Sequence, residues 1–83
     1  MTVPLSDVEL DTPCTVEHVG GERAFRRRLM EMGLVPGTRV TKTHIAPLGD
    51  PMELRVRGGR LSIRRRDAEA LVVRISAGRT PSP

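Results

Sequence analysis

The sequence has almost no aromatic residues, and Phe25 is the only one among its 83 residues. Domains that bind single-stranded nucleic acid or proline-rich peptides usually pack their ligands against exposed aromatic rings. A chain with one aromatic side chain cannot build such a platform. The composition therefore excludes ligands that are recognised by stacking.

Cysteine is equally scarce, since Cys14 is the only one. A single cysteine rules out an intramolecular disulfide and a four-cysteine zinc site, and it suits a reducing compartment. No run of about 18 apolar residues is present, which is the length that a transmembrane helix needs. The first residues also lack the basic and apolar regions of a signal peptide. We therefore expect a cytoplasmic protein with no direct membrane insertion.

The sequence contains no recognisable catalytic motif. No serine lies in a Gly-x-Ser-x-Gly pattern, and no glycine precedes a lysine as a P-loop requires. Cys14 and His18 cannot form a nucleophile–base pair on a regular strand, because four strand residues separate them by about 13 Å. We therefore predict that the protein is not an enzyme and needs no cofactor.

Residues that bind transition metals are few and scattered. The candidates are Cys14, His18, His44 and Asp50. They show neither the helical i, i+3 or i, i+4 spacing of binding motifs nor a Cys-x-x-Cys knuckle. The two histidines still meet if they lie on adjacent strands. A lone cysteine is more often a small buried apolar residue, so we assign no metal site and leave the question open for these four residues.

One amphipathic helix is predicted over residues 22–32. Phe25, Leu29 and Met32 share one face at 3.6 residues per turn. Gly33 stands where a left-handed residue ends many helices, and Leu34 then packs back on Leu29 as in a Schellman motif. We therefore expect a positive φ at Gly33.

Other signals bound the helix and the segments that follow it. Glu22 places a carboxylate in the first helical turn, where the helix dipole favours it. Pro36-Gly37 predicts a type II turn after the helix. Residues 65–70 are expected to form a single helical turn. Residues 1–76 are predicted to form one domain, and residues 77–83 a disordered tail.

The rest of the chain predicts short strands. Their expected ranges are 14–19, 38–46, 52–57, 60–64 and 71–75. With Gly58-Gly59 as a hairpin loop, Val56 pairs with Leu61 and Arg57 with Arg60. We predict a mainly β fold, a small barrel of about five strands. Its expected core is Phe25, Leu29, Met32, Leu54, Val56, Leu61, Ile63, Leu71 and Val73.

The order of these motifs, from residue 5 to 75, resembles the FeoA family of ferrous-iron transport proteins. The matching segments are Arg27-Arg28-Leu29 through Gly33-Leu34, Pro36-Gly37, Pro47-Leu48-Gly49-Asp50-Pro51, the Gly59 turn, Leu61-Ser62-Ile63-Arg64-Arg65, Asp67-Ala68, Leu71 and Val73. The resemblance implies an SH3-like barrel that binds the cytoplasmic region of the FeoB-type permease and modulates its GTPase-linked transport. The sequence leaves open the sign of the regulation and whether the protein forms a homo-oligomer.

Two surfaces are candidates for partner binding. On the helix, Arg23 and Arg27 point outward with Met30 beside them. Met30 is then either a contact point or packs under the 47–51 loop. The second surface is the outer face of the hairpin, which carries four arginines and one acidic residue, Glu53. The full set of candidate partner-binding residues is Arg23, Arg27, Met30, Arg55, Arg57, Arg60 and Arg64.

Arginine dominates the basic residues, and this leaves a second functional class open. Lys42 is the only lysine among 14 basic residues, and the net charge is +4. Arginine forms bidentate contacts with phosphate and carboxylate, although a solvated basic face would have the same composition. A small basic barrel that binds nucleic acid through phosphates is therefore the first alternative, although the lack of aromatics argues against nucleic acid as a partner. A stand-alone relative of the C-terminal domain of metal-dependent repressors is the second.

Overall fold

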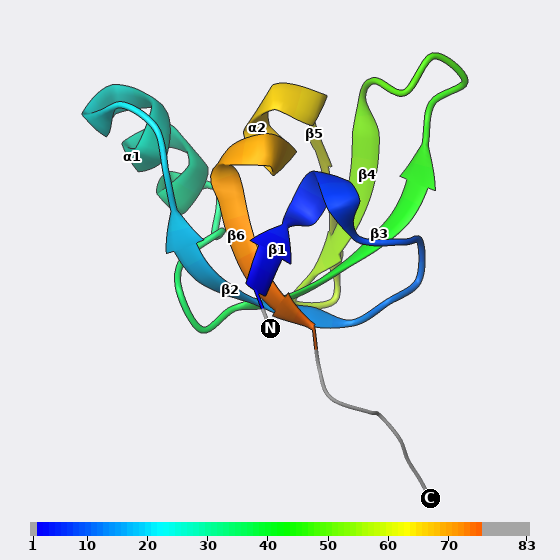
Figure 1. The fold of residues 1–83 in the computed structure, drawn as a ribbon, viewed down its shortest axis with the longest axis horizontal. Helices are drawn as coiled ribbons and strands as arrows, with labels where there is room; N and C mark the ends of the chain where they lie inside the picture. Colours follow the sequence, from blue (N-terminus) through cyan, green and yellow to red (C-terminus); the bar gives the residue numbers. More distant parts are fainter. Residues whose placement is uncertain (1, 76–83) are drawn as a thin grey trace, which may run out of the picture.

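The computed structural model describes residues 2–75, which form one six-stranded antiparallel sheet with two short α-helices (Figure 1). The strands are β1 (Thr2–Pro4), β2 (Cys14–Val19), β3 (Arg39–Ile45), β4 (Met52–Val56), β5 (Gly59–Ile63) and β6 (Leu71–Ile75), in the spatial order β1-β6-β2-β3-β4-β5. The helices are α1 (Arg23–Glu31) and α2 (Arg65–Ala70), and a 3-10 turn, η1, spans Leu5–Asp7. The expected tail, residues 77–83, lies outside the described residues.

The mainly β fold is confirmed, but it has one strand more than the five that we expected. The additional strand, β1, pairs with β6 and places Val3 opposite Val73. It has three residues and ends in Pro4, so it is too short to show the alternation by which strands are recognised. Its partner is about 70 residues away in the chain, and local sequence carries no signal of that pairing.

The end of α1 is the Schellman motif that the sequence predicts. Gly33 has a φ of 101°, its N–H donates to the Met30 carbonyl at 3.0 Å, and the Leu34 N–H donates to the Leu29 carbonyl at 3.1 Å. Leu29 and Leu34 are both fully buried in the core. At the other end, Glu22 is the N-cap residue and not part of the first turn, and its side chain makes no capping hydrogen bond.

The predicted turn after α1 is also present. The Thr38 N–H donates to the Val35 carbonyl at 3.0 Å, and Gly37 at the third position has a φ of 95°. A proline at the second position and a positive φ at the third are typical of a type II turn. This turn directs the chain from α1 into β3.

The predicted register of the β4–β5 hairpin is wrong by two residues. Its two-residue loop is Arg57-Gly58, with φ values of 53° and 79°, and Val56 lies opposite Gly59. Two positive φ values suit a type I′ turn, which follows the twist of a hairpin. The shift of two residues keeps each side chain on its predicted face. The arginine that faces Arg60 is therefore Arg55, and not Arg57.

Five of the nine expected core residues are buried. They are Leu29, Leu54, Ile63, Leu71 and Val73. The other four, Phe25, Met32, Val56 and Leu61, are half-buried and pack against the core. The centre of the core instead contains residues that we did not predict: Leu5, Val8, Cys14, Val16, Val19, Leu34, Val40, Met52 and Ala68. Most of them belong to the N-terminal third of the chain. This part packs against β6 and α2, and the periodicity of the sequence did not reveal that packing.

Candidate partner-binding surfaces

The outer face of α1 is the first candidate surface. The helix buries Leu29 against the core, so the residues on its opposite side face solvent. They form a shallow hollow of about 430 Å³, lined by Arg23, Arg26, Arg27, Met30 and Glu31. The structure therefore brings together the three helix residues that we selected from the sequence.

Met30 lies at the surface and keeps 37% of its area exposed. The residues that share its hollow all belong to α1, and none belongs to the 47–51 loop. Beside it, Arg27 Nε and Glu31 Oε2 form the i, i+4 ion pair at 3.5 Å, with both side chains largely exposed. Such a pair contributes little to stability, so Arg27 remains available to a partner.

The outer face of β3, β4 and β5 is the second candidate surface. Arg55 lies opposite Arg60, and Arg57 follows in the turn. Glu53 reaches Arg60 at 4.0 Å, so part of this charge is neutralised. The fourth predicted residue of this group, Arg64, lies beyond the end of β5 as the N-cap of α2. It lines a different hollow, together with Arg28 and Asp67.

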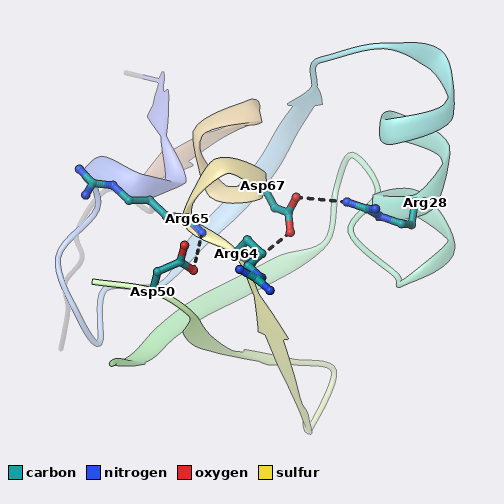
Figure 2. Close-up of polar contacts among 5 residues, drawn as sticks. All are labelled: Arg28, Asp50, Arg64, Arg65 and Asp67. Carbon is teal, nitrogen blue, oxygen red and sulfur yellow. Dashed lines mark hydrogen bonds and ion pairs between the residues drawn. The ribbon is translucent and has the colours of Figure 1, made fainter. Parts of the chain in front are cut away.

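Two carboxylates fix the start of α2 (Figure 2). Asp67 accepts the Arg64 N–H at 3.0 Å with one oxygen, and its other oxygen lies 3.4 Å from Nη2 of Arg28 on α1. Asp50 of the β3–β4 loop accepts the Arg65 N–H at 3.1 Å. Segments from three parts of the chain are thereby joined at the first turn of α2.

The β3–β4 loop presents a feature that we missed from the sequence. Leu48 keeps 94% of its area exposed, although the loop around it is held by hydrogen bonds. Gly49 N–H donates to the Ala46 carbonyl at 2.7 Å, and Ala46 N–H donates to the Pro51 carbonyl at 3.0 Å. In Figure 1 this loop projects beyond the sheet. The Pro-Leu-Gly-Asp-Pro segment predicts a stiff loop, but it does not tell which side chain faces outward.

The candidate metal ligands do not come together in the structure. Cys14 is buried, whereas His18 lies opposite Val72 on β6 and His44 opposite Glu53 on β4. The two histidines are therefore not cross-strand neighbours. Among residues 2–75, no group of three histidine, cysteine or acidic side chains could hold a metal ion.

A lysine and a cysteine are buried together in the barrel. Lys42 is 2% exposed, and its Nζ donates to the Ser6 carbonyl at 3.3 Å. Burial lowers the pKa of Lys42, against the opposing effect of Cys14 and Asp7. Burial likewise raises the pKa of the Cys14 thiol to about 11, against the opposing effect of Lys42. Burial therefore favours the neutral form of both groups. For the thiol, a raised pKa is typical of an unreactive, structural cysteine.

No helix within residues 2–75 is long and apolar enough to cross a membrane.

Comparisons with known proteins identify the family. The FeoA domain model matches residues 3–75. A fusion of Fe(2+) transport protein A with Fe(2+) transporter FeoB from Porphyromonas gingivalis (strain ATCC BAA-308 / W83) is 38% identical over 80 residues, which are 95% of this chain and 10% of the fusion protein. This chain therefore spans about a tenth of the length of that relative.

Two solved structures share the fold. The FeoA protein of Chlorobium tepidum is 41% identical, with a TM-score of 0.84 over 94% of this chain and 74% of that one. The zinc complex of FeoA from Stenotrophomonas maltophilia is 32% identical, with a TM-score of 0.68 over 89% of each chain, and is described as a prokaryotic SH3 domain protein. The fold is thus an SH3-like barrel, as expected. The chain belongs to the FeoA family, whose role is in ferrous-iron transport.

Proposed function

We propose that this protein is a non-catalytic accessory protein of ferrous-iron uptake, which binds the cytoplasmic region of a FeoB-type permease and modulates its GTPase-linked transport. The observation that carries the proposal is the Porphyromonas gingivalis relative, in which a segment similar to nearly the whole of this chain is fused to an Fe(2+) transporter. Fusion keeps two domains at a high effective concentration. It therefore supports a direct contact between the corresponding separate proteins.

We take the outer face of α1 as the docking surface. Methionine and arginine are enriched where proteins meet, and Met30 lies among Arg23, Arg26 and Arg27 in one shallow hollow. The core depends on the opposite side of the helix, through Leu29. A partner can therefore cover the outer face without any change in the packing of the barrel.

The test is a double variant on the helix, Arg27→Glu with Met30→Asp. Both side chains are exposed, so circular dichroism should show a folded protein. Co-purification with the permease and ferrous-iron uptake in cells should both fall. The matched control is Arg57→Glu with Arg60→Glu on the hairpin, which also introduces negative charge on an exposed basic surface and should leave both readouts unchanged.

The two variants separate the two candidate surfaces. Loss of binding in the hairpin variant alone would move the docking surface to the hairpin, with Arg55, Arg57 and Arg60. If neither variant affects binding, the exposed Leu48 becomes the next position to replace, with Leu48→Asp. An intact complex after all three changes would contradict a direct contact through these surfaces. Modulation is tested separately, by GTP hydrolysis of the permease's cytoplasmic region with and without this protein.

A further inference from the structure

The outer face of the sheet contains a hollow of about 410 Å³ that is lined mainly by arginine and threonine side chains. Its lining residues are Gly37, Thr38, Arg39, Thr41, Arg55, Arg57 and Gly58. Thr41 lies directly opposite Arg55, and Arg39 precedes Thr41 by two residues, so these side chains share one face of the sheet. The fold thus gathers three arginines from two strands and a turn around one concavity.

The three arginines have no acidic partner in the part of the chain that the structure describes. Glu53, two residues before Arg55 on the same face of β4, pairs with Arg60 at 4.0 Å, and Glu17 of β2 pairs with Arg74 at 3.2 Å. Within residues 2–75, no carboxylate forms an ion pair with Arg39, Arg55 or Arg57. The hollow therefore carries an excess of positive charge close to the protein surface.

This arrangement is unfavourable for the protein alone. Arg55 and Arg60 lie directly opposite each other on neighbouring strands, where like charges destabilise a sheet, and the Glu53 carboxylate pairs with Arg60 alone. Arg57 also has a φ of 53°, a conformation that non-glycine residues seldom adopt. A bound anion would offset the repulsion, so the geometry is suited to an anionic ligand.

We propose that this hollow, formed by Arg39, Thr41, Arg55 and Arg57, binds a phosphate group. A carboxylate offers two oxygens and one charge, whereas a phosphate monoester offers three oxygens and between one and two charges. Several guanidinium groups can contact a phosphate at once through paired N–H donors, and the Thr41 hydroxyl is a further donor. The Oγ1 of Thr38 is covered by protein atoms, so the ligand contacts the arginines and Thr41 and not that hydroxyl.

The ligand is recognised by its phosphate and not by a base. The only aromatic ring, Phe25, belongs to α1 and does not line the hollow. Stacking of a nucleobase on an aromatic ring is therefore not available at this site. Inorganic phosphates and the phosphates of a nucleotide present the same chemistry to the arginines, and the experiment distinguishes these two sources.

The test is a titration of the ¹⁵N-labelled protein with inorganic pyrophosphate at low ionic strength, with sodium chloride added to equal ionic strength as the blank. Saturable amide shifts should be largest at Gly37, Thr41 and Gly58. Replacement of the three arginines, Arg39→Gln, Arg55→Gln and Arg57→Gln, should weaken binding by about tenfold or more, because each bidentate contact is charge-assisted. The matched control, Arg23→Gln, Arg26→Gln and Arg27→Gln on α1, removes the same charge and should bind as the unchanged protein does.

Further titrations with ADP, GDP and duplex DNA of arbitrary sequence distinguish the possible ligands. Equal affinity for pyrophosphate and both nucleotides supports a site for free phosphate, and a higher affinity for either nucleotide supports a nucleotide as the source. The absence of saturable shifts, or equal weakening in both triple variants, would overturn the proposal. Binding of DNA more tightly than any of the small phosphates would overturn it in favour of a nucleic-acid surface. None of these measurements involves the permease, so failure here leaves the docking proposal untouched.

Discussion

One carboxylate oxygen of Asp67 lies 3.4 Å from Nη2 of Arg28, although 39 positions separate the two residues in the sequence. The Asp67 side chain is 7% exposed, and its second oxygen accepts the Arg64 N–H at 3.0 Å. The same carboxylate thus caps α2 and reaches α1 (Figure 2). Asp67 therefore connects the helix that we propose as the docking surface with the rest of the barrel.

The first prediction concerns this carboxylate. Asp67→Ala leaves the Arg64 N–H without its partner and should lower the free energy of unfolding by about 2–3 kcal/mol. Arg28→Gln removes only the partly exposed member of the pair, and should cost less than about 1 kcal/mol. Urea unfolding followed by circular dichroism measures both. Arg27→Gln is the control, because its ion pair with Glu31 is exposed; an Asp67→Ala protein as stable as this control would contradict the capping role.

The second prediction ranks two residues on the inner face of α1. Leu29 is fully buried, whereas Phe25 is half-buried, with Arg28 stacked 5.5 Å from its ring centre. Leu29→Ala should therefore cost about 2–5 kcal/mol, and Phe25→Ala about half as much. Sequence periodicity placed both residues on the core face without ranking them, and the structure separates them by burial. Thermal unfolding of the two variants in parallel gives the ranking, and a larger loss for Phe25→Ala would show that the ring contributes more than its burial suggests.

A third prediction follows from the Schellman motif. Gly33 has a φ of 101°, and a Cβ at this position would meet no atom within 4 Å. The cost of a side chain is therefore conformational: about 1 kcal/mol for Gly33→Ala, more for the β-branched Gly33→Val, and least for Gly33→Asn. Denaturant unfolding of the three variants gives the series. A Gly33→Ala protein more stable than the unchanged one would mean that the helix continues past this residue.

The sequence predicted well those features that neighbouring residues determine. The end of α1 and the turn after it depend on glycine, proline and apolar residues within a few positions of one another, and both agree with the structure. The faces of the hairpin were also predicted correctly, because alternation fixes which side chains share a face. Alternation does not determine the pairing register of β4 and β5, because a shift of two residues leaves the alternation unchanged. The structure resolves it with Arg57 in the turn, a residue that no turn preference would select.

Features that depend on distant segments were not predictable. From the sequence, Lys42 is one polar residue of a predicted strand. Its surroundings in the structure include Ser6 and Cys14, which come from other elements. The composition of the candidate surfaces also depends on residues from distant segments. The sequence assigned Arg55 and Arg57 to one exposed face, but the hollow also needs Arg39, which reaches it only because β3 pairs with β4. The β3–β4 loop is likewise tied to a distant segment, because Asp50 accepts the Arg65 N–H of α2.

The fourth prediction concerns Thr38, whose hydroxyl oxygen is buried and has no hydrogen-bond partner among residues 2–75. Valine has nearly the same shape and no hydroxyl group, so Thr38→Val removes a buried polar atom without opening a cavity. The free energy of unfolding should rise by about 1 kcal/mol. The backbone bonds of Thr38, to Val35 and Val16, are unaffected. Thr38→Ala is the control, since it removes the hydroxyl but also a methyl group; a loss of stability in Thr38→Val equal to that in Thr38→Ala would contradict the prediction.

The fifth prediction is a pH dependence that Cys14 and Lys42 produce in opposite directions. The thiol has a pKa of about 11 in the folded protein against 9.0 in a model compound, so the folded state holds its proton more tightly. The contribution of the Cys14 thiol to the free energy of unfolding is fully present below about pH 9, and it is lost as the pH rises through 11. The pKa of Lys42 is lowered on folding, so the unfolded state binds more protons there and the contribution of Lys42 rises with pH up to its unfolded value of 10.5.

A Cys14→Ala variant separates the two effects. The chain has no tyrosine and no second lysine, and arginine stays protonated throughout this range, so few other groups titrate between pH 8.5 and 11. The free energy of unfolding, measured in urea at intervals across that range, should fall in the unchanged protein relative to the variant by about 2 kcal/mol, since one pKa unit corresponds to 1.36 kcal/mol. The variant should keep only the rise that Lys42 causes. If the two curves stay parallel, the Cys14 thiol titrates alike in the folded and unfolded states, and the buried cysteine–lysine pair does not govern the alkaline stability of the barrel.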